Sequence, residues 1–257
     1  MELARFIFWT ALKALGLVFL GLLAGKGIGS LRSASGANDS RQLTWAKRGL
    51  TTLAVALAVW GGRSVGLDVA AENYAYVSQK NLSAGQVAKA YENSSKAVEM
   101  RPGVLRYWRA LERAKFAQRQ FASVVTDSST LESLSGGSLE EEDSYRLAAS
   151  YYFLAQFDKT VALTTRLIKE NRSYAAPYVL QGFAYTAQKD FPKAERTFLE
   201  VLQMFPTHQA AVEGLAHAHF LRGNTPAALS VLEQTARFPF SPEARQRFAG
   251  LKALYAQ

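Results

Sequence analysis

The sequence has 257 residues, of which 49% are hydrophobic, and it carries a formal net charge of +9 and no cysteine. The hydrophobic fraction is too high for a disordered chain. Without cysteine the chain cannot build a disulfide framework, an iron–sulfur cluster, a thiolate zinc site or a covalently attached c-type haem. The excess of positive charge is compatible with nucleic acid or an acidic lipid surface as a partner, so its position along the chain decides between them.

The positive charge is concentrated near the N-terminus. Residues 1–70 hold eight Lys and Arg against three acidic residues, a net charge of +5. Residues 71–257 hold 22 against 18, a net charge of +4 spread over a much longer segment. A nucleic-acid-binding domain would carry its basic excess on the folded part, so we expect no nucleic-acid partner. Basic residues beside apolar segments favour a membrane instead.

Two apolar segments in residues 1–70 predict a membrane-anchor region. Residues 6–24 contain one charge, Lys13, and match the length of a membrane-spanning helix. Residues 49–67 form a second, weaker span that contains Arg63, and a basic loop, 25–48, lies between them. Lys13 and Arg63 are therefore candidate intramembrane polar residues. If both segments span a bacterial inner membrane, the positive-inside rule places the loop in the cytoplasm and both ends of the chain, with the domain 71–257, in the periplasm.

Other interpretations of this region stay open. Residues 6–24 could be a single retained anchor, with 49–67 outside the membrane. Residues 1–25 could also be a signal peptide or a mitochondrial presequence, since small residues lie at Ala24 and Gly25 and acidic residues are scarce.

The rest of the chain repeats with a period of 34 residues. Laying residues 175–208 on a helix–turn–helix template places Tyr178, Gly182, Tyr185, Ala194, Phe198 and Pro206 at template positions 4, 8, 11, 20, 24 and 32. Similar units follow at 209–240 and precede at 141–174, 105–138 and 71–104. A slip of two residues predicts a lengthened turn near 135–139. Residues 241–255, which begin with Ser241, Pro242 and Glu243, predict a capping helix.

These units resemble the tetratricopeptide repeat (TPR) family. The resemblance implies an all-α fold: an α-solenoid of about five repeats over residues 71–257 that ends in the cap helix, preceded by one or two transmembrane helices. Small residues at positions 8 and 20 would let the two helices of a unit approach closely. The proline at position 32 would end the second helix.

No residue set in the sequence supports catalysis. His217 and His219 are two residues apart on a predicted helix, so they cannot bind one metal ion together. The acidic run 140–143 lies at a predicted helix start, where acids stabilise the helix dipole. We therefore expect a protein without enzymatic activity, metal or cofactor.

The TPR resemblance implies a partner-binding groove lined by positions 2, 5, 9, 12 and 13 of each first helix. The residues at these positions that we select as candidates are Arg106, Arg109, Arg113, Phe116, Tyr145, Tyr152, Phe153, Val179, Phe183, Glu213, His217 and Phe220. They predict a basic end and an aromatic continuation, which would suit a peptide with an acidic terminus and apolar anchors. The alternative is that the arginines form a solvated face and the aromatic rings pack between repeats. The carboxylate clamp of chaperone-binding TPR proteins is absent, because Ala75 and Gln79 replace its lysine and asparagine.

Three functions follow from these features. The first is a membrane-anchored scaffold or adaptor that binds a protein partner and supports assembly or stability of a membrane-associated complex. The second is an integral accessory subunit of a larger membrane complex, in which Lys13 and Arg63 meet polar groups of neighbouring helices. The third is a factor that delivers apoprotein during cytochrome c maturation, whose TPR subunits the chain resembles in layout.

Overall fold

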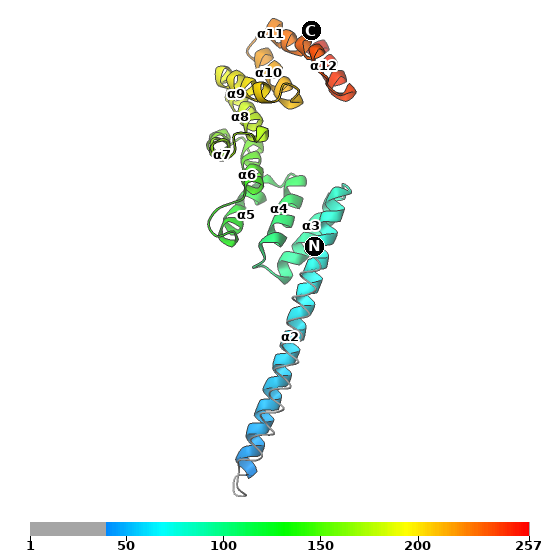
Figure 1. Ribbon diagram of the computed structural model, residues 1–257, viewed down its shortest axis with the longest axis vertical. Coiled ribbons are helices and arrows are strands. Elements are labelled where there is room, and N and C mark those ends of the chain that lie inside the picture. Colours follow the sequence, from blue (N-terminus) through cyan, green and yellow to red (C-terminus); the bar gives the residue numbers. More distant parts are fainter. Residues whose placement is uncertain (1–39, 257) are drawn as a thin grey trace. The chain divides into compact units, whose positions relative to one another are not determined.

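The computed structural model describes residues 40–256, and over that range it consists of helices joined by turns, without a strand (Figure 1). The α-helices are α2 (Ser40–Ser83), α3 (Val87–Met100), α4 (Leu105–Ala117), α5 (Phe121–Leu134), α6 (Glu141–Phe153), α7 (Phe157–Glu170), α8 (Ala175–Ala187), α9 (Phe191–Met204), α10 (Gln209–Leu221), α11 (Thr225–Gln234) and α12 (Pro242–Tyr255). A short 3₁₀ helix, η1 (Thr235–Arg237), follows α11. The all-α expectation is confirmed over the described residues.

The chain divides into two compact units, Met1–Leu111 and Glu112–Gln257, with the division inside α4. In unit 2 each helix from α5 to α12 packs against the next one along the chain (Figure 1). The helix pairs α6/α7, α8/α9 and α10/α11 occupy the expected repeats 141–174, 175–208 and 209–240. A long turn of residues 135–140 separates α5 from α6, and Gly136 and Gly137 take positive φ angles of 85° and 97° there.

The two helices of a unit meet closely at template positions 8 and 20, as two repeats show. Ala216 and Ala228 are both fully buried where α10 meets α11. In repeat 141–174, Thr160 replaces the expected small residue, and its hydroxyl donates to the Ala148 carbonyl at 3.3 Å. The hydroxyl is thereby satisfied inside a buried contact, which explains why a polar residue is tolerated there.

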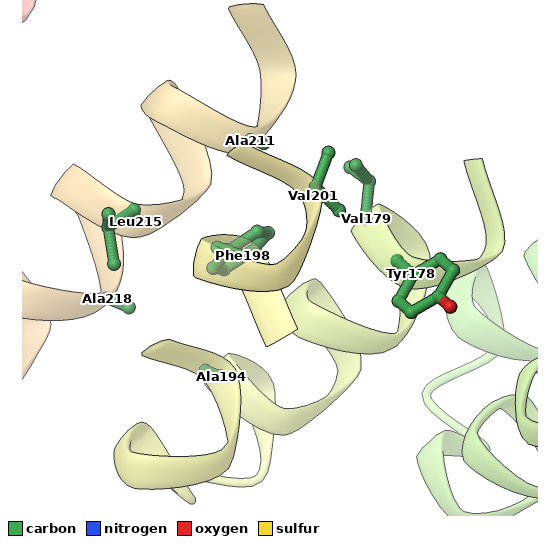
Figure 2. Packing of buried hydrophobic residues seen from close by; sticks show 8 residues of the cluster. All are labelled: Tyr178, Val179, Ala194, Phe198, Val201, Ala211, Leu215 and Ala218. Carbon is green, nitrogen blue, oxygen red and sulfur yellow. The ribbon is translucent and has the colours of Figure 1, made fainter. Parts of the chain in front are cut away.

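A phenylalanine forms the centre of a buried hydrophobic cluster in unit 2 (Figure 2). Phe198 on α9 is fully buried, among neighbours that include Tyr178 and Leu215. Two glycines make room for its ring: a Cβ at Gly182 would lie 2.6 Å from Phe198 Cε1, and one at Gly214 would lie closer still to Cζ. The ring therefore fills the space between α8 and α10 that the missing side chains leave open.

The turn between the two helices of a unit has a fixed backbone conformation. Each of these turns contains one residue with a positive φ angle. In two turns it is a glycine, Gly85 (72°) or Gly223 (84°). In the other three it is a residue with a side chain: Arg119 (61°), Ala155 (56°) or Lys189 (62°). The turn is closed by hydrogen bonds back into the preceding helix, such as Gln156 N to Tyr151 O at 2.9 Å. This geometry is the usual glycine-favouring end of an α-helix.

Replacing Ala155 by glycine is therefore expected to stabilise unit 2. Removing the Cβ relieves a left-handed conformation that costs an L-residue about 1–2 kcal/mol, and the greater freedom of glycine in the unfolded chain cancels part of that gain. A net increase of about 0.5 kcal/mol in the free energy of unfolding should be measurable by urea denaturation. The reverse change, Gly223→Ala, should destabilise the protein, and an equal effect of both changes would contradict this account.

Helix α2 differs most from the sequence expectations. It runs without a break from Ser40 to Ser83, so it contains the last part of the expected basic loop, the whole expected span 49–67 and the first helix of repeat 71–104. The expected boundary between residues 70 and 71 thus lies inside one helix. The segment 40–83 contains no proline to interrupt it.

Contacts in unit 1 hold α3 against the C-terminal half of α2. Arg101 Nε lies 2.5 Å from Asp68 Oδ1, and Arg101 Nη2 donates to the Ser64 carbonyl at 2.5 Å. Further along, the buried Ser78 hydroxyl donates to the Ala90 carbonyl at 2.7 Å. Residues 64–78 of α2 therefore belong to the folded unit.

The described residues include one of the two expected membrane spans. Residues 6–24 and Lys13 lie outside the described residues. Arg63 lies on α2 and is exposed to solvent. Among the helices of residues 40–256, none combines the length and the apolar composition needed to cross a membrane.

Candidate functional site

Two of the three arginines expected at the basic end of the groove, Arg106 and Arg113, are compensated by acidic residues within their own units. In unit 1, Arg106 Nη2 lies 2.6 Å from Glu72 Oε2, and its guanidinium lies over the Tyr107 ring. In unit 2, Arg113 Nη2 lies 3.3 Å from Glu142 Oε2. Arg109 is half-buried. The structure therefore does not present Arg106 and Arg113 as an uncompensated basic stripe, because an acidic partner balances the charge of each.

The expected aromatic part of the groove begins with a cluster at the ends of α4 and α6. The Phe153 ring stacks on Phe121 with centroids 4.4 Å apart, and Phe116 contacts both rings edge to face. Tyr152 joins Phe153 at 5.6 Å and extends the cluster to Phe157. Phe153 keeps 57% of its surface exposed, although stacking already covers one face. We call Phe116, Phe121, Tyr152, Phe153 and Phe157 the aromatic edge.

Two members of the aromatic edge were not among the residues expected from the sequence. Phe121 and Phe157 are the first residues of α5 and α7, and Phe191 holds the same place on α9. The sequence does show a phenylalanine at template position 17 in three successive units, and this recurrence could have indicated that the start of the second helix belongs to the aromatic surface. It was missed because the resemblance assigned partner binding only to the first helix of each unit.

The expected groove residues in the middle of unit 2 are largely part of the core. Val179 is only 7% exposed and packs in the Phe198 cluster (Figure 2). Phe183 meets Phe198 edge to face with centroids 5.3 Å apart. Tyr145 contacts Tyr174, and burial raises the pKa of its phenol. Val179 in particular has little surface for a partner, because the helix pairs pack tightly at this point.

The expected groove residues of the last repeat are met by α12. Arg247 Nη2 lies 3.0 Å from Glu213 Oε2, and Tyr255 stacks on Phe220 with centroids 4.3 Å apart. The Tyr255 hydroxyl also lies 3.4 Å from Nδ1 of His217, whose pKa burial lowers, so that the imidazole is neutral at neutral pH. The cap helix thus covers part of this end of the surface that the sequence assigned to a partner, while His217 stays exposed.

Among the aromatic groove residues expected in unit 2, Phe153 in the aromatic edge is therefore the one that stays most exposed. Stacked rings with one large exposed face suit an apolar or aromatic anchor of a protein partner. Over residues 40–256, no group of three or more metal-ligating side chains converges on one point.

Comparison with known proteins agrees with this helical architecture. A family model described as tetratricopeptide repeat matches residues 185–254, from the end of α8 to α12. A solved structure of MamA, residues 41 to the end, from Desulfovibrio magneticus RS-1 is 16% identical, with a TM-score of 0.58 over 65% of this chain and 93% of that one. TTC0263 from Thermus thermophilus, a thermophilic TPR protein, is 16% identical, with a TM-score of 0.55 over 70% and 98%.

A third solved structure is YrrB, described as a TPR protein with an unusual peptide-binding site. It is 15% identical, with a TM-score of 0.50 over 62% of this chain and 81% of that one. No curated protein matches the chain by sequence. At these identities the solved structures establish the arrangement of helices and leave the partner to be inferred from the site.

Proposed function

We propose that this chain, whose fold is that of the TPR proteins, is a membrane-anchored scaffold that binds a protein partner and has no catalytic role of its own. The observation that carries the binding role is the aromatic edge, in which Phe153 is 57% exposed on a rigid stack of rings. Burying such a ring against an apolar side chain contributes about 1.5–3 kcal/mol to association. The peptide-binding site named for YrrB supports the same class of function on this fold.

The membrane part of the proposal is supported by the sequence. Residues 6–24 have the length and composition of a spanning helix, and the basic segment 25–48 follows directly. In this proposal the bacterial inner membrane holds residues 6–24. With this single span the positive-inside rule places segment 25–48 and the folded residues that follow it on the cytoplasmic side, whereas the periplasmic side would require residues 49–67 to cross as well. The scaffold would then recruit its partner to a membrane-associated complex.

Site-specific photo-crosslinking in native membranes tests the proposal. A photoreactive amino acid at Phe153 should yield a discrete crosslinked protein from the membrane fraction. The same residue at Leu199, an apolar side chain exposed to a similar degree on α9, is the matched control and should not yield it.

Substitution then tests whether the aromatic ring provides the affinity. Phe153→Ala should weaken capture of that protein by about tenfold or more, the size expected for an interface anchor, without lowering thermal stability much. Identical crosslinks from both positions, or undiminished capture by Phe153→Ala, would contradict partner binding at the aromatic edge.

A further inference from the structure

Helix α2 exposes a regularly spaced apolar face that none of the helices described for residues 40–111 covers. Its members are Val55, Val59, Gly62, Gly66, Val69, Asn73 and Tyr76, all of them exposed. The four large apolar side chains among them, Val55, Val59, Val69 and Tyr76, are 62%, 67%, 50% and 67% exposed. We call these seven residues the α2 stripe.

The α2 stripe lies on the side of the helix opposite α3. Contacts with α3 are made through residues such as Ala71 and Ser78, which are buried. With 3.6 residues per turn, the stripe positions fall about half a turn away from them. In unit 1, α2 also extends well beyond the end of α3 as a single helix (Figure 1). The stripe is thus a separate surface, distinct from the interior of the unit.

The spacing of the stripe is that of a coiled-coil seam. Its residues alternate at steps of four and three, a heptad pattern sustained from Val55 to Tyr76. In this register Val59, Gly66 and Asn73 take the a positions. β-Branched residues and a single asparagine at a positions favour a parallel pair of helices, because two asparagines at the same level can hydrogen-bond to each other.

The two glycines of the stripe allow a close approach. Gly62 and Gly66 are four residues apart, and a Cβ at either would meet no other atom within 4 Å. Small residues at this spacing let two helix backbones come together. Glu72, a charged residue beside the stripe, would face Val77 of a second copy in register, so no like charge opposes it.

Burial in a lipid bilayer cannot by itself explain why the α2 stripe is apolar. The stripe continues past the expected span 49–67 to Val69, Asn73 and Tyr76, where α2 is already part of the folded unit held by Arg101. A terminal solenoid unit normally turns a polar face outward, whereas this one turns an apolar face outward. We propose that the α2 stripe is a homodimer interface, at which α2 of a second copy packs in parallel and in register.

Cysteine crosslinking tests the register directly, because the full chain contains no native cysteine. In mild detergent, Val69→Cys and Asn73→Cys should each form a disulfide-linked dimer on gentle oxidation. Ala88→Cys, exposed on α3, is the control and should stay monomeric. Equal dimer yields at all three positions would overturn the proposal. Crosslinking only between chains carrying Val55→Cys and chains carrying Tyr76→Cys would overturn the parallel arrangement.

Mass measurement of the full chain in detergent gives a second test. The wild-type protein should have twice the 28.2 kDa mass of one chain after correction for bound detergent. The double change Val69→Lys with Tyr76→Lys should halve that mass while leaving the circular dichroism unchanged, since both side chains are exposed. A monomeric wild type, or an unchanged dimer in the variant, would overturn the proposal. Neither test depends on the aromatic edge, so failure here leaves the proposed function intact.

Discussion

Replacing Gly214 by alanine is expected to destabilise unit 2 by about 2–3 kcal/mol, the cost of forcing an extra methyl group into a close-packed core. The added Cβ would overlap the Phe198 ring, which Gly182 confines from the other side, where a Cβ would lie 2.6 Å away. Phe198 is fully buried, so the ring has no free space into which it can retreat. Gly182→Ala should have an effect of similar size for the same reason.

A glycine elsewhere in unit 2 gives a matched control. Gly250 lies within α12, and a Cβ there would meet nothing within 4 Å. Because alanine is the better helix former, Gly250→Ala should stabilise the protein by up to about 1 kcal/mol. Urea denaturation followed by circular dichroism measures all three variants. A loss of stability in Gly250→Ala equal to that in Gly214→Ala would show that the Phe198 contact is not the cause.

This pair of glycines also shows how far the sequence could predict the fold. Gly182 stands at template position 8, where the repeat pattern already predicts a close contact between helices. Gly214 stands at position 6 of the next repeat, for which the pattern makes no demand. Its importance depends on how α9 and α10 pack, which is a tertiary contact and cannot be read from the periodicity of one segment.

The candidate site was predictable to a smaller extent. Phe116, Tyr152 and Phe153 were expected from their template positions and do meet in the aromatic edge. Val179 was expected from the same template and is buried, because groove position and exposure depend on how closely neighbouring helices approach. Glu213, His217 and Phe220 meet α12, a contact that the repeat pattern did not anticipate.

A buried carboxylate, Glu112, departs from the repeat pattern. Glu112 stands at position 8 of its repeat, where a small residue is the rule, and it is only 2% exposed. Arg146 Nε donates to Glu112 Oε2 at 3.1 Å, and its Nη2 pairs with the equally buried Asp143. Burial is the main reason that the pKa of Glu112 is raised to about 7; Arg146 opposes the shift and Asp143 adds to it.

Removing Arg146, the cation that Glu112 and Asp143 share, should lower the free energy of unfolding more than any of the glycine substitutions. Arg146→Met leaves two buried carboxylates facing each other, and breaking a buried pair in this way costs about 3–5 kcal/mol. The loss should be greater at pH 8 than at pH 5, where Glu112 can take up a proton. Arg166→Met is the control, since Arg166 pairs with Glu170 on the surface and should cost less than about 1 kcal/mol.

The same carboxylate predicts how stability depends on pH. Between about pH 4.5 and 7 the folded state keeps a proton on Glu112 that the unfolded chain has released, so the free energy of unfolding should fall as pH rises. The loss should approach about 3 kcal/mol at pH 8, from 1.4 kcal/mol per unit of pKa difference. Glu112→Gln keeps the shape and removes this titration, so its free energy of unfolding should not fall between pH 5 and 8, and the lowered pKa of His217 should make it rise slightly with pH. Parallel pH profiles for the two proteins would show that Glu112 is not the group that titrates, since every other ionisable residue is common to both.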